Sequence, residues 1–293
     1  MAPPGHPAVP PRPGAVAAAL RRLAGLFLAH GLLLAGAAVI LLPFAWMMLV
    51  SIRSPGEILD PGFRLWPRQF HGVENYGYAL ANAPLLRFML TGLVVCLGIL
   101  VVQLAVAIPC AYALAKLRFP GGKALFLLVL LGLCIPIQVP ALPLYIALAN
   151  LGLLNTYFSL MLPFFVSVFA IFLFRQFFKS YPDEIIQAAR LDGVGEFEIV
   201  WRIVAPSAAP AIAAFSVFSV VAHWNDLYWP MIVVTETRLA TPPLGMMYLA
   251  NAETGSNYGA LMAGAAIITA PLVAAFLVAR RRFIQGITMT GIK

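Results

Sequence analysis

The chain is organised as six long apolar blocks, each close to the length that a helix needs to cross a membrane. They lie at residues 23–50, 88–114, 124–149, 158–174, 207–229 and 259–279. About 20 apolar residues in a helix cross the roughly 30 Å of hydrocarbon in a bilayer. Helices satisfy all their backbone hydrogen bonds within one segment, which the absence of water in the bilayer demands. The pattern predicts an all-α polytopic membrane protein with six transmembrane helices.

The composition excludes an ordinary soluble domain. Hydrophobic residues make up 62% of the chain and charged residues 10%, whereas soluble domains are about 25% charged. The net charge of +8 is explained by basic cytoplasmic loops, so no nucleic-acid partner is expected. Three cysteines (Cys96, Cys110, Cys134) lie inside apolar blocks without the spacing of metal ligands, so neither a disulfide nor a metal site is predicted.

The distribution of Lys and Arg predicts the orientation of the chain. If both termini are cytoplasmic, the inner segments carry fourteen of the nineteen basic residues, and the outer segments carry Arg53, Arg64, Arg68, Arg87 and Arg238. Basic residues are enriched on the cytoplasmic side of membrane proteins. Residues 1–22, rich in Pro, Ala and Gly, are predicted to be a disordered cytoplasmic tail before the six-helix membrane region 23–280. Residues 281–293 form a second cytoplasmic tail.

The third apolar block contains three prolines, Pro136, Pro140 and Pro143. Each removes a backbone donor, so the helix should kink or break, which is tolerated where neighbouring protein or a water-filled cavity satisfies the freed carbonyls. This block, with Gln138 between its prolines, is therefore a candidate wall of a pathway. A kink with a purely structural role is the alternative.

Residues 180–206 (SYPDEIIQAARLDGVGEFEIVWRIVAP) are too polar to cross a bilayer. They hold five of the eleven acidic residues of the chain, namely Asp183, Glu184, Asp192, Glu196 and Glu198. Ser180 and Asp183 have the spacing of a capping box, which predicts a helix to about Leu191. Gly193 is available for the left-handed residue that follows a helix end.

A second short helix is predicted from about Gly195 to Pro206. One apolar stripe recurs at helical spacing, formed by Phe197, Val200, Trp201 and Val204, and Glu198 and Arg202 form an i, i+4 pair. The two helices together predict a cytoplasmic two-helix loop, which we call the knob (residues 180–206). The adjacent small residues Ala188 and Ala189 would allow another backbone to approach closely.

The knob also carries a recognisable signature. Gln187-Ala-Ala-Arg-Leu-Asp-Gly193, followed by Ile203-Val-Ala-Pro206, resembles the EAA signature of the permease subunits of bacterial ABC importers. Trp224-Asn225 late in the fifth block and the ending Gly291-Ile-Lys293 extend the similarity over the chain after residue 20. The chain is most similar to the smaller, maltose-permease-like subunit of the carbohydrate-uptake class, which implies the type I importer permease fold.

The resemblance implies a set of partners in the bacterial inner membrane and around it. These are a second homologous permease subunit, two ATPase subunits that bind ATP and Mg, an extracytoplasmic solute-binding protein and membrane lipid. The knob would insert into a cleft of the ATPase and transmit its closure to the spanning helices. The corresponding positions are Ala188, Ala189, Asp192 and Gly193, with Gln187 at the glutamate of the family; Glu184, one turn earlier, can supply that charge. The tail 281–293 would reach the ATPase dimer.

The chain itself is not expected to be an enzyme or to bind a cofactor. It contains no G-x-x-x-x-G-K-[ST] phosphate loop, so ATP must be hydrolysed by a partner. Two other functions are possible for a polytopic membrane protein. A secondary transporter would place ionisable groups at mid-membrane, and a membrane-embedded enzyme would need convergent catalytic side chains. The predicted function is import of a sugar or oligosaccharide by alternating access, with a polyol, glycerol phosphate or acidic oligosaccharide as alternative solutes.

Candidate pathway residues cluster at the outer end of the fifth block. Polar groups at membrane depth usually face a bundle interior or a cavity, and neighbouring aromatic rings could stack on sugar rings. The candidates are Trp224, Asn225, Asp226 and Tyr228, together with Gln138. Trp229 is interpreted as part of an interfacial aromatic belt. Gln103, alone in the second block, is predicted to form a helix–helix hydrogen bond.

Overall fold

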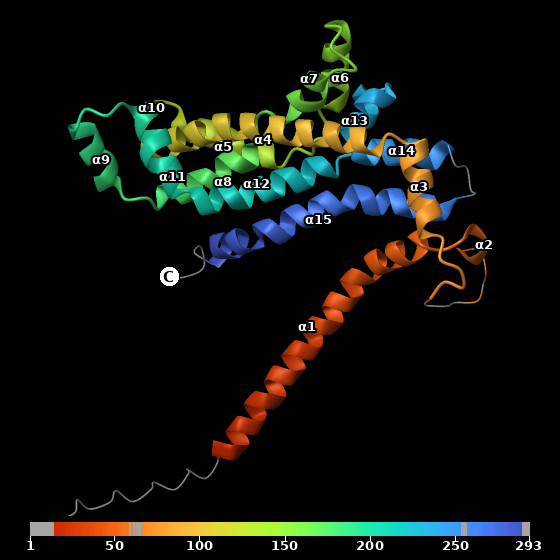
Figure 1. Ribbon diagram of the computed structural model, residues 1–293. Coiled ribbons are helices and arrows are strands. Elements are labelled where there is room, and N and C mark those ends of the chain that lie inside the picture. The colour runs from red at the N-terminus through yellow and green to blue at the C-terminus, as the bar shows by residue number, and fades with distance from the viewer. Residues whose placement is uncertain (1–14, 59, 61, 63–65, 253–256, 289–293) are drawn as a thin grey trace, which may run out of the picture.

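Helices form every regular element in the described part of the chain. The computed structural model describes residues 15–58, 60, 62, 66–252 and 257–288 (Figure 1). Three of its helices, α1 (Ala15–Ser51), α4 (Leu85–Lys116) and α15 (Tyr258–Thr288), contain segments long and apolar enough to cross a membrane. The all-α membrane architecture is confirmed.

Two further spans are broken rather than straight. Helix α7 (Tyr157–Met161) and the 3₁₀ turn η1 (Leu162–Phe164) meet α8 (Val168–Lys179) at a bend of 45°. The predicted third span is interrupted between α5 (Gly122–Leu133) and α6 (Ala141–Asn150), as expected, and Pro136 and Pro140 lie in the break, whereas Pro143 lies in the first turn of α6. Since α5 and α6 are each short, the number of six spans stays a prediction.

The bundle has two packed ends. At one end lie α2 (Pro55–Ile58), α3 (Gly72–Asn82), α13 (Tyr228–Val233), η3 (Thr237–Leu239) and α14 (Pro242–Ala252); the opposite end carries α9 (Figure 1). A hydrophobic core fills each end, with Phe88 and Trp229 in the first and Phe174 and Phe178 in the second. We refer to these as the α3 end and the α9 end.

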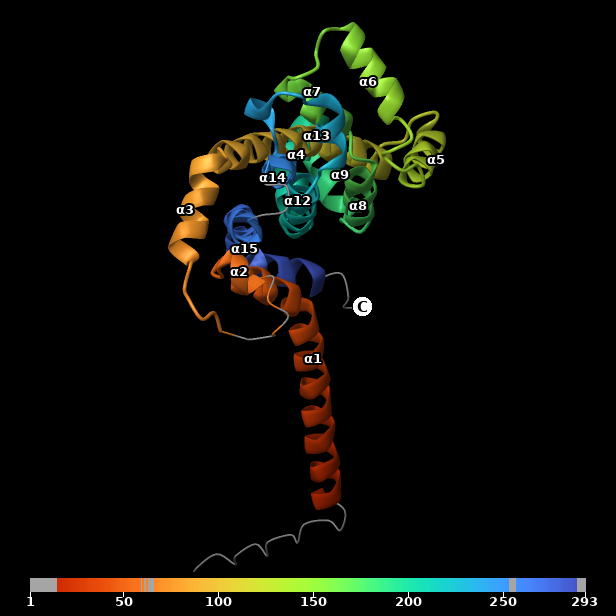
Figure 2. The same ribbon diagram turned by 90° about the vertical axis from the view of Figure 1, so that its right-hand side faces the viewer.

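Helix α1 departs from the prediction at its start. It begins at Ala15, so the predicted disordered tail 1–22 is wrong for residues 15–22, while residues 1–14 lie outside the described residues. The basic pair Arg21-Arg22 does not interrupt it, because arginine is a good helix former. The first half of α1 diverges from the rest of the bundle (Figures 1 and 2).

Helix α15 likewise runs beyond its predicted end at 279. It continues to Thr288, so most of the predicted tail 281–293 extends this helix; residues 289–293 lie outside the described residues.

Candidate functional site

The first helix of the knob is α9 (Asp183–Leu191). Its extent matches the prediction, but the predicted capping box is wrong. The hydroxyl of Ser180 donates to the carbonyl oxygen of Phe177 at 2.8 Å, within the preceding helix, and Pro182 occupies the N-cap position. Gly193 has φ 81°, which confirms that this glycine supplies the left-handed residue after α9.

The second part of the knob is less regular than predicted. It consists of α10 (Glu196–Glu198), a π-helix η2 (Ile199–Val204) and α11 (Ala205–Ser207). The wider π turn shifts the register of the apolar stripe. Phe197, which belongs to the predicted stripe, is 75% exposed, whereas Ile199, which does not belong to it, is fully buried. The pair of Glu198 with Arg202 is confirmed.

The knob also ends later than expected. Pro206 lies inside α11, and the chain bends by 81° between α11 and α12 (Ala209–Trp224). A proline in the first turn of a helix loses no intrahelical hydrogen bond, which explains why Pro206 does not terminate it.

The two faces of α9 have different neighbours. Ile186 and Ala189 are buried against the bundle, whereas Glu184, Ala188 and Leu191 are exposed, with Leu191 88% exposed. Of the two predicted small residues, therefore, only Ala188 is open to an approaching partner. The exposed positions are spaced i, i+4, i+7, so they form one outward stripe.

Two side chains of α4 attach the knob to the spanning helices. The Lys116 ammonium donates to the carbonyl oxygen of Tyr181 and to Oδ1 of Asp183, both at 2.5 Å. The Tyr112 hydroxyl donates to Oε2 of Glu196 at 2.7 Å, and the other oxygen of Glu196 accepts from Nε of Arg190 at 2.6 Å. Both parts of the knob are thus tied to the last turns of α4.

The sequence reading missed these attachments. The sequence did contain a signal for them, because Tyr112 and Lys116 are four residues apart and therefore share one face of α4. The ammonium of Lys116 also lowers the pKa of the Asp183 carboxyl below its ordinary value, through a hydrogen bond and through charge attraction.

A shared hydrophobic core strengthens the connection. Ile186, Ile199 and Val204 of the knob pack in one cluster with Ala111 of α4 and Phe174 of α8. Because close-packed interiors transmit displacement, the knob should move together with α4 and α8.

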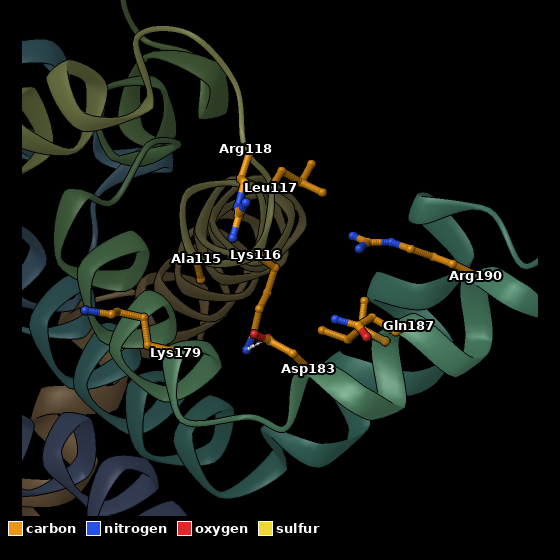
Figure 3. A pocket seen from close by; sticks show the side chains of 9 residues that line it. Ala115, Lys116, Leu117, Arg118, Lys179, Asp183, Gln187 and Arg190 are labelled. Carbon is orange, nitrogen blue, oxygen red and sulfur yellow. Dashed lines mark hydrogen bonds and ion pairs between the residues drawn. The ribbon is translucent and has the colours of Figure 1, made fainter.

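A cleft of about 600 Å³ separates the end of α4 from α9 (Figure 3). Its lining side chains come from the end of α4, the end of α8 and one face of α9: Ala115, Lys116, Leu117, Arg118, Lys179, Asp183, Ile186, Gln187 and Arg190. Gln187 therefore faces the α4 end of its own chain, beside the outward stripe of α9. Asp192 is exposed in the turn after α9.

The pathway candidates lie in two places. Trp224 ends α12 and is 6% exposed, and its buried Nε1 has no hydrogen-bond partner among the residues that the structure describes. Asn225 and Asp226 form the connection to α13; the Asn225 amide donates to Val221 O at 2.8 Å, and Asp226 Oδ1 accepts from the backbone NH of Trp229 at 3.3 Å.

Tyr228 is exposed at the start of α13, whereas Gln138 is exposed in the break between α5 and α6. No hydrogen bond joins Gln138 to the other candidates in the described part of the chain. Trp229 does not fit the predicted interfacial belt. It is 2% exposed and donates from Nε1 to Ser159 O at 2.8 Å, so it belongs to the core.

Gln103 forms the predicted helix–helix contact and a larger network besides. Its Nε2 donates to the carbonyl oxygen of Phe164 at 2.9 Å and lies 3.3 Å from Nε2 of His223, while its Oε1 accepts from the Ser219 hydroxyl at 2.6 Å. The network joins α4 and α12 to the broken span. Ser219 and His223, spaced i, i+4, were the overlooked sequence signal.

Among the described residues, no group of three His, Cys, Asp or Glu side chains is placed to hold a metal ion.

Comparison with known proteins gives consistent matches. The profile of a family described as "Binding-protein-dependent transport system inner membrane component" matches residues 104–289. The diacetylchitobiose uptake system permease protein NgcG of Streptomyces coelicolor is 30% identical over 94% of this chain and 90% of its own length. The sn-glycerol-3-phosphate transport system permease protein UgpE of Rhizobium meliloti is 33% identical over 89% of this chain and 95% of its own.

A solved structure has the same fold. It is described as a bacterial ABC transporter involved in the import of the acidic polysaccharide alginate, and one of its chains aligns with a TM-score of 0.76 at 22% identity. The alignment covers 96% of this chain and 100% of that one.

Proposed function

The chain belongs to the family of binding-protein-dependent transport system inner membrane components, and from this premise we propose that it is the permease subunit of an ATP-driven sugar importer. It is a multi-pass inner-membrane protein, and its relatives are transport permeases rather than enzymes. Membership in this family therefore argues against the two alternatives, a secondary transporter and a membrane-embedded enzyme.

The solute is a sugar or oligosaccharide. The similarity to a diacetylchitobiose permease supports this class. The amide of Asn225 and the carboxyl group of Asp226 can form hydrogen bonds with the hydroxyl groups of a sugar. The exposed ring of Tyr228, close to them in the chain, can pack against the face of the sugar ring. A glycerol phosphate, by analogy with UgpE, is the second candidate, but the acidic Asp226 would repel its phosphate. A polyol fits the same class of importer without a charge, whereas an acidic oligosaccharide, the remaining alternative, would meet the same repulsion from Asp226 as glycerol phosphate.

The chain works with partners that supply energy and solute. Two ATPase subunits bind ATP and Mg, a second homologous permease completes the pathway, and an extracytoplasmic solute-binding protein delivers the solute. Both termini and the α9 end face the cytoplasm, as the distribution of basic residues favours. The knob then lies where the ATPase can reach it.

The attachment of the knob to α4 carries this proposal. Closure of the ATPase dimer displaces the outward stripe of α9, formed by Glu184, Ala188 and Leu191. Lys116 and Tyr112 pass that displacement to α4, and the shared core passes it to α8. The spans thereby alternate between inward-open and outward-open states, each favoured by one nucleotide state of the partner.

The test is solute-stimulated ATPase activity of the reconstituted complex carrying Ala188→Trp. The large ring on the exposed stripe should prevent close approach of the ATPase, so stimulated turnover should fall at least tenfold. Ala81→Trp, at an exposed alanine of α3 at the opposite end of the bundle, is the matched control and should retain activity. Full stimulation of the Ala188→Trp complex would refute the docking role of the stripe.

A screen of solutes in the same complex tests the substrate class. Sugars and oligosaccharides should stimulate ATP hydrolysis in the presence of the binding protein, whereas glycerol phosphate should not. Stimulation by glycerol phosphate alone would assign the chain to the second candidate.

A further inference from the structure

The cleft between α4 and α9 has an excess of positive charge. Four cationic side chains and one acidic side chain line it, for a net charge of +3. Lys116 is matched by Asp183, and Arg190 is matched by Glu196. Arg118 has no hydrogen bond or ion pair within the described part of the chain, and it is exposed.

Gln187 contributes to this excess. It lies in the cleft between Lys116 and Arg190, and Arg118 extends over the end of α4 on the opposite side (Figure 3). A glutamate at this position would add a negative charge to the cleft. With glutamine, the cleft keeps an amide donor and two cations, Arg118 and Lys179, that form no ion pair within the described part of the chain, and these groups together suit an external anion.

The basic residues of the cleft follow directly on an apolar span. The apolar sequence of α4 continues to Ala115, and Lys116 and Arg118 come next, which is the order of residues typical of the cytoplasmic headgroup region. A second depression of about 440 Å³ adjoins the cleft and shares Leu117 and Arg118 with it. Its walls include Leu114, Phe119 and Pro120 as well as the cations Lys123 and Arg175, so the polar cleft continues into a surface that is partly apolar and also basic.

We propose that this cleft binds the phosphate of an anionic phospholipid headgroup, with Arg118 as the principal cation and Gln187 as a hydrogen-bond donor. The lipid tails would follow the apolar walls of the adjoining depression. Anionic lipids of the cytoplasmic leaflet are attracted to basic pockets between spanning helices on that side. The inference uses the cytoplasmic orientation of the α9 end, but it does not depend on which solute is transported.

A carboxylate of a partner protein is a poorer occupant. The outward stripe of α9 shares no residue with the cleft lining and lies on an adjacent side of the helix, so a partner that covers the stripe need not enter the cleft. A surface with apolar and basic side chains that is continuous with the cationic cleft matches an anionic lipid, which carries both chemistries in one molecule.

Native mass spectrometry of the purified full-length chain tests the proposal through retained lipid. With equal amounts of phosphatidylglycerol and phosphatidylcholine supplied, the unaltered chain should retain phosphatidylglycerol preferentially. Each cation near the surface contributes about fivefold to such binding. Arg118→Gln should therefore weaken retention about fivefold, Gln187→Glu by a similar factor, and the double variant roughly 25-fold.

Two further variants separate the site from general charge effects. Arg118→Lys keeps the charge and should restore preferential retention. Arg202→Gln removes one cation from the same knob outside the cleft and should retain phosphatidylglycerol like the unaltered chain. All the altered side chains are exposed, so folding should be preserved.

Three results would overturn the assignment. The first is equal retention of the two lipids. The second is an equal loss of retention in Arg118→Gln and Arg202→Gln. The third is displacement of the lipid by inorganic phosphate or by the assembled ATPase, which would assign the cleft to a free ion or to the partner. None of these measurements requires transport, so failure here is distinct from failure of the proposed function.

Discussion

The turn between the two helices of the knob offers a sharp test, because two glycines in it differ in one property. Gly193 has φ 81°, whereas Gly195 has φ −71°. A β carbon added to either one would meet no atom within 4 Å, so steric clashes do not distinguish them. Only backbone strain does.

The expected difference follows from the backbone alone. An L-residue in the left-handed region costs about 1–2 kcal/mol, and Gly193→Ala alone carries this strain. Alanine also restricts the unfolded chain, which is worth about 0.4–1 kcal/mol of stability, but this gain is common to Gly193→Ala and Gly195→Ala. The two variants should therefore differ by the strain alone, about 1–2 kcal/mol in the free energy of opening the knob.

Limited proteolysis measures that free energy directly. Trypsin cleaves after Arg190 only when α9 opens, and the cleavage rate then follows the open population. The rate should be roughly 5- to 30-fold higher for Gly193→Ala than for Gly195→Ala. Gly193→Asn should fall between them, since asparagine tolerates this region. Equal cleavage rates for the two alanine variants would refute the reasoning.

Three further predictions concern other contacts. Gln103→Leu should lower the free energy of unfolding by about 1–3 kcal/mol, because its buried hydrogen-bond partners lose their bonds; a change within error in thermal unfolding would contradict this. Lys116 holds the pKa of Asp183 below the ordinary 3.8, so the folded state binds this proton less readily than the unfolded chain. The stabilisation by Asp183 should be complete above about pH 4 and vanish as the pH falls through the lowered pKa. Melting curves of Asp183→Asn across that range should converge with those of the unaltered protein only at the acid end. Gly245→Ala should cost about 1–3 kcal/mol, since its β carbon would lie 2.1 Å from a ring atom of α4, while Gly77→Ala, with open space, should cost nothing measurable in the same melts.

Local patterns predicted the helical elements well. The apolar blocks located α1, α4 and α15, and the composition of the segment 180–206 located a helix–turn–helix with a left-handed residue at Gly193. These predictions succeeded because hydrophobic length and glycine conformation are properties of a few neighbouring residues. The prolines of the third block likewise predicted its interruption.

Predictions that depended on a partner elsewhere in the chain were less successful. The hydroxyl of Ser180 caps nothing in α9, and the stripe of the second helix is shifted by a π turn that buries Ile199. Ala189 and Trp229 face the core rather than a partner or the membrane interface. In each case, helical periodicity identified a face, but packing against another helix decided what that face met.

The sequence by itself determined that this chain is a helical membrane protein with one polar knob, because the bilayer leaves few choices to apolar segments of this length. Only the tertiary structure decided how the knob is held: Lys116 and Tyr112 of α4 bind its two parts across more than sixty intervening residues. It also decided that Gln187 faces a cationic cleft. Such contacts join residues remote in the chain, and their energies depend on distances that only folding sets.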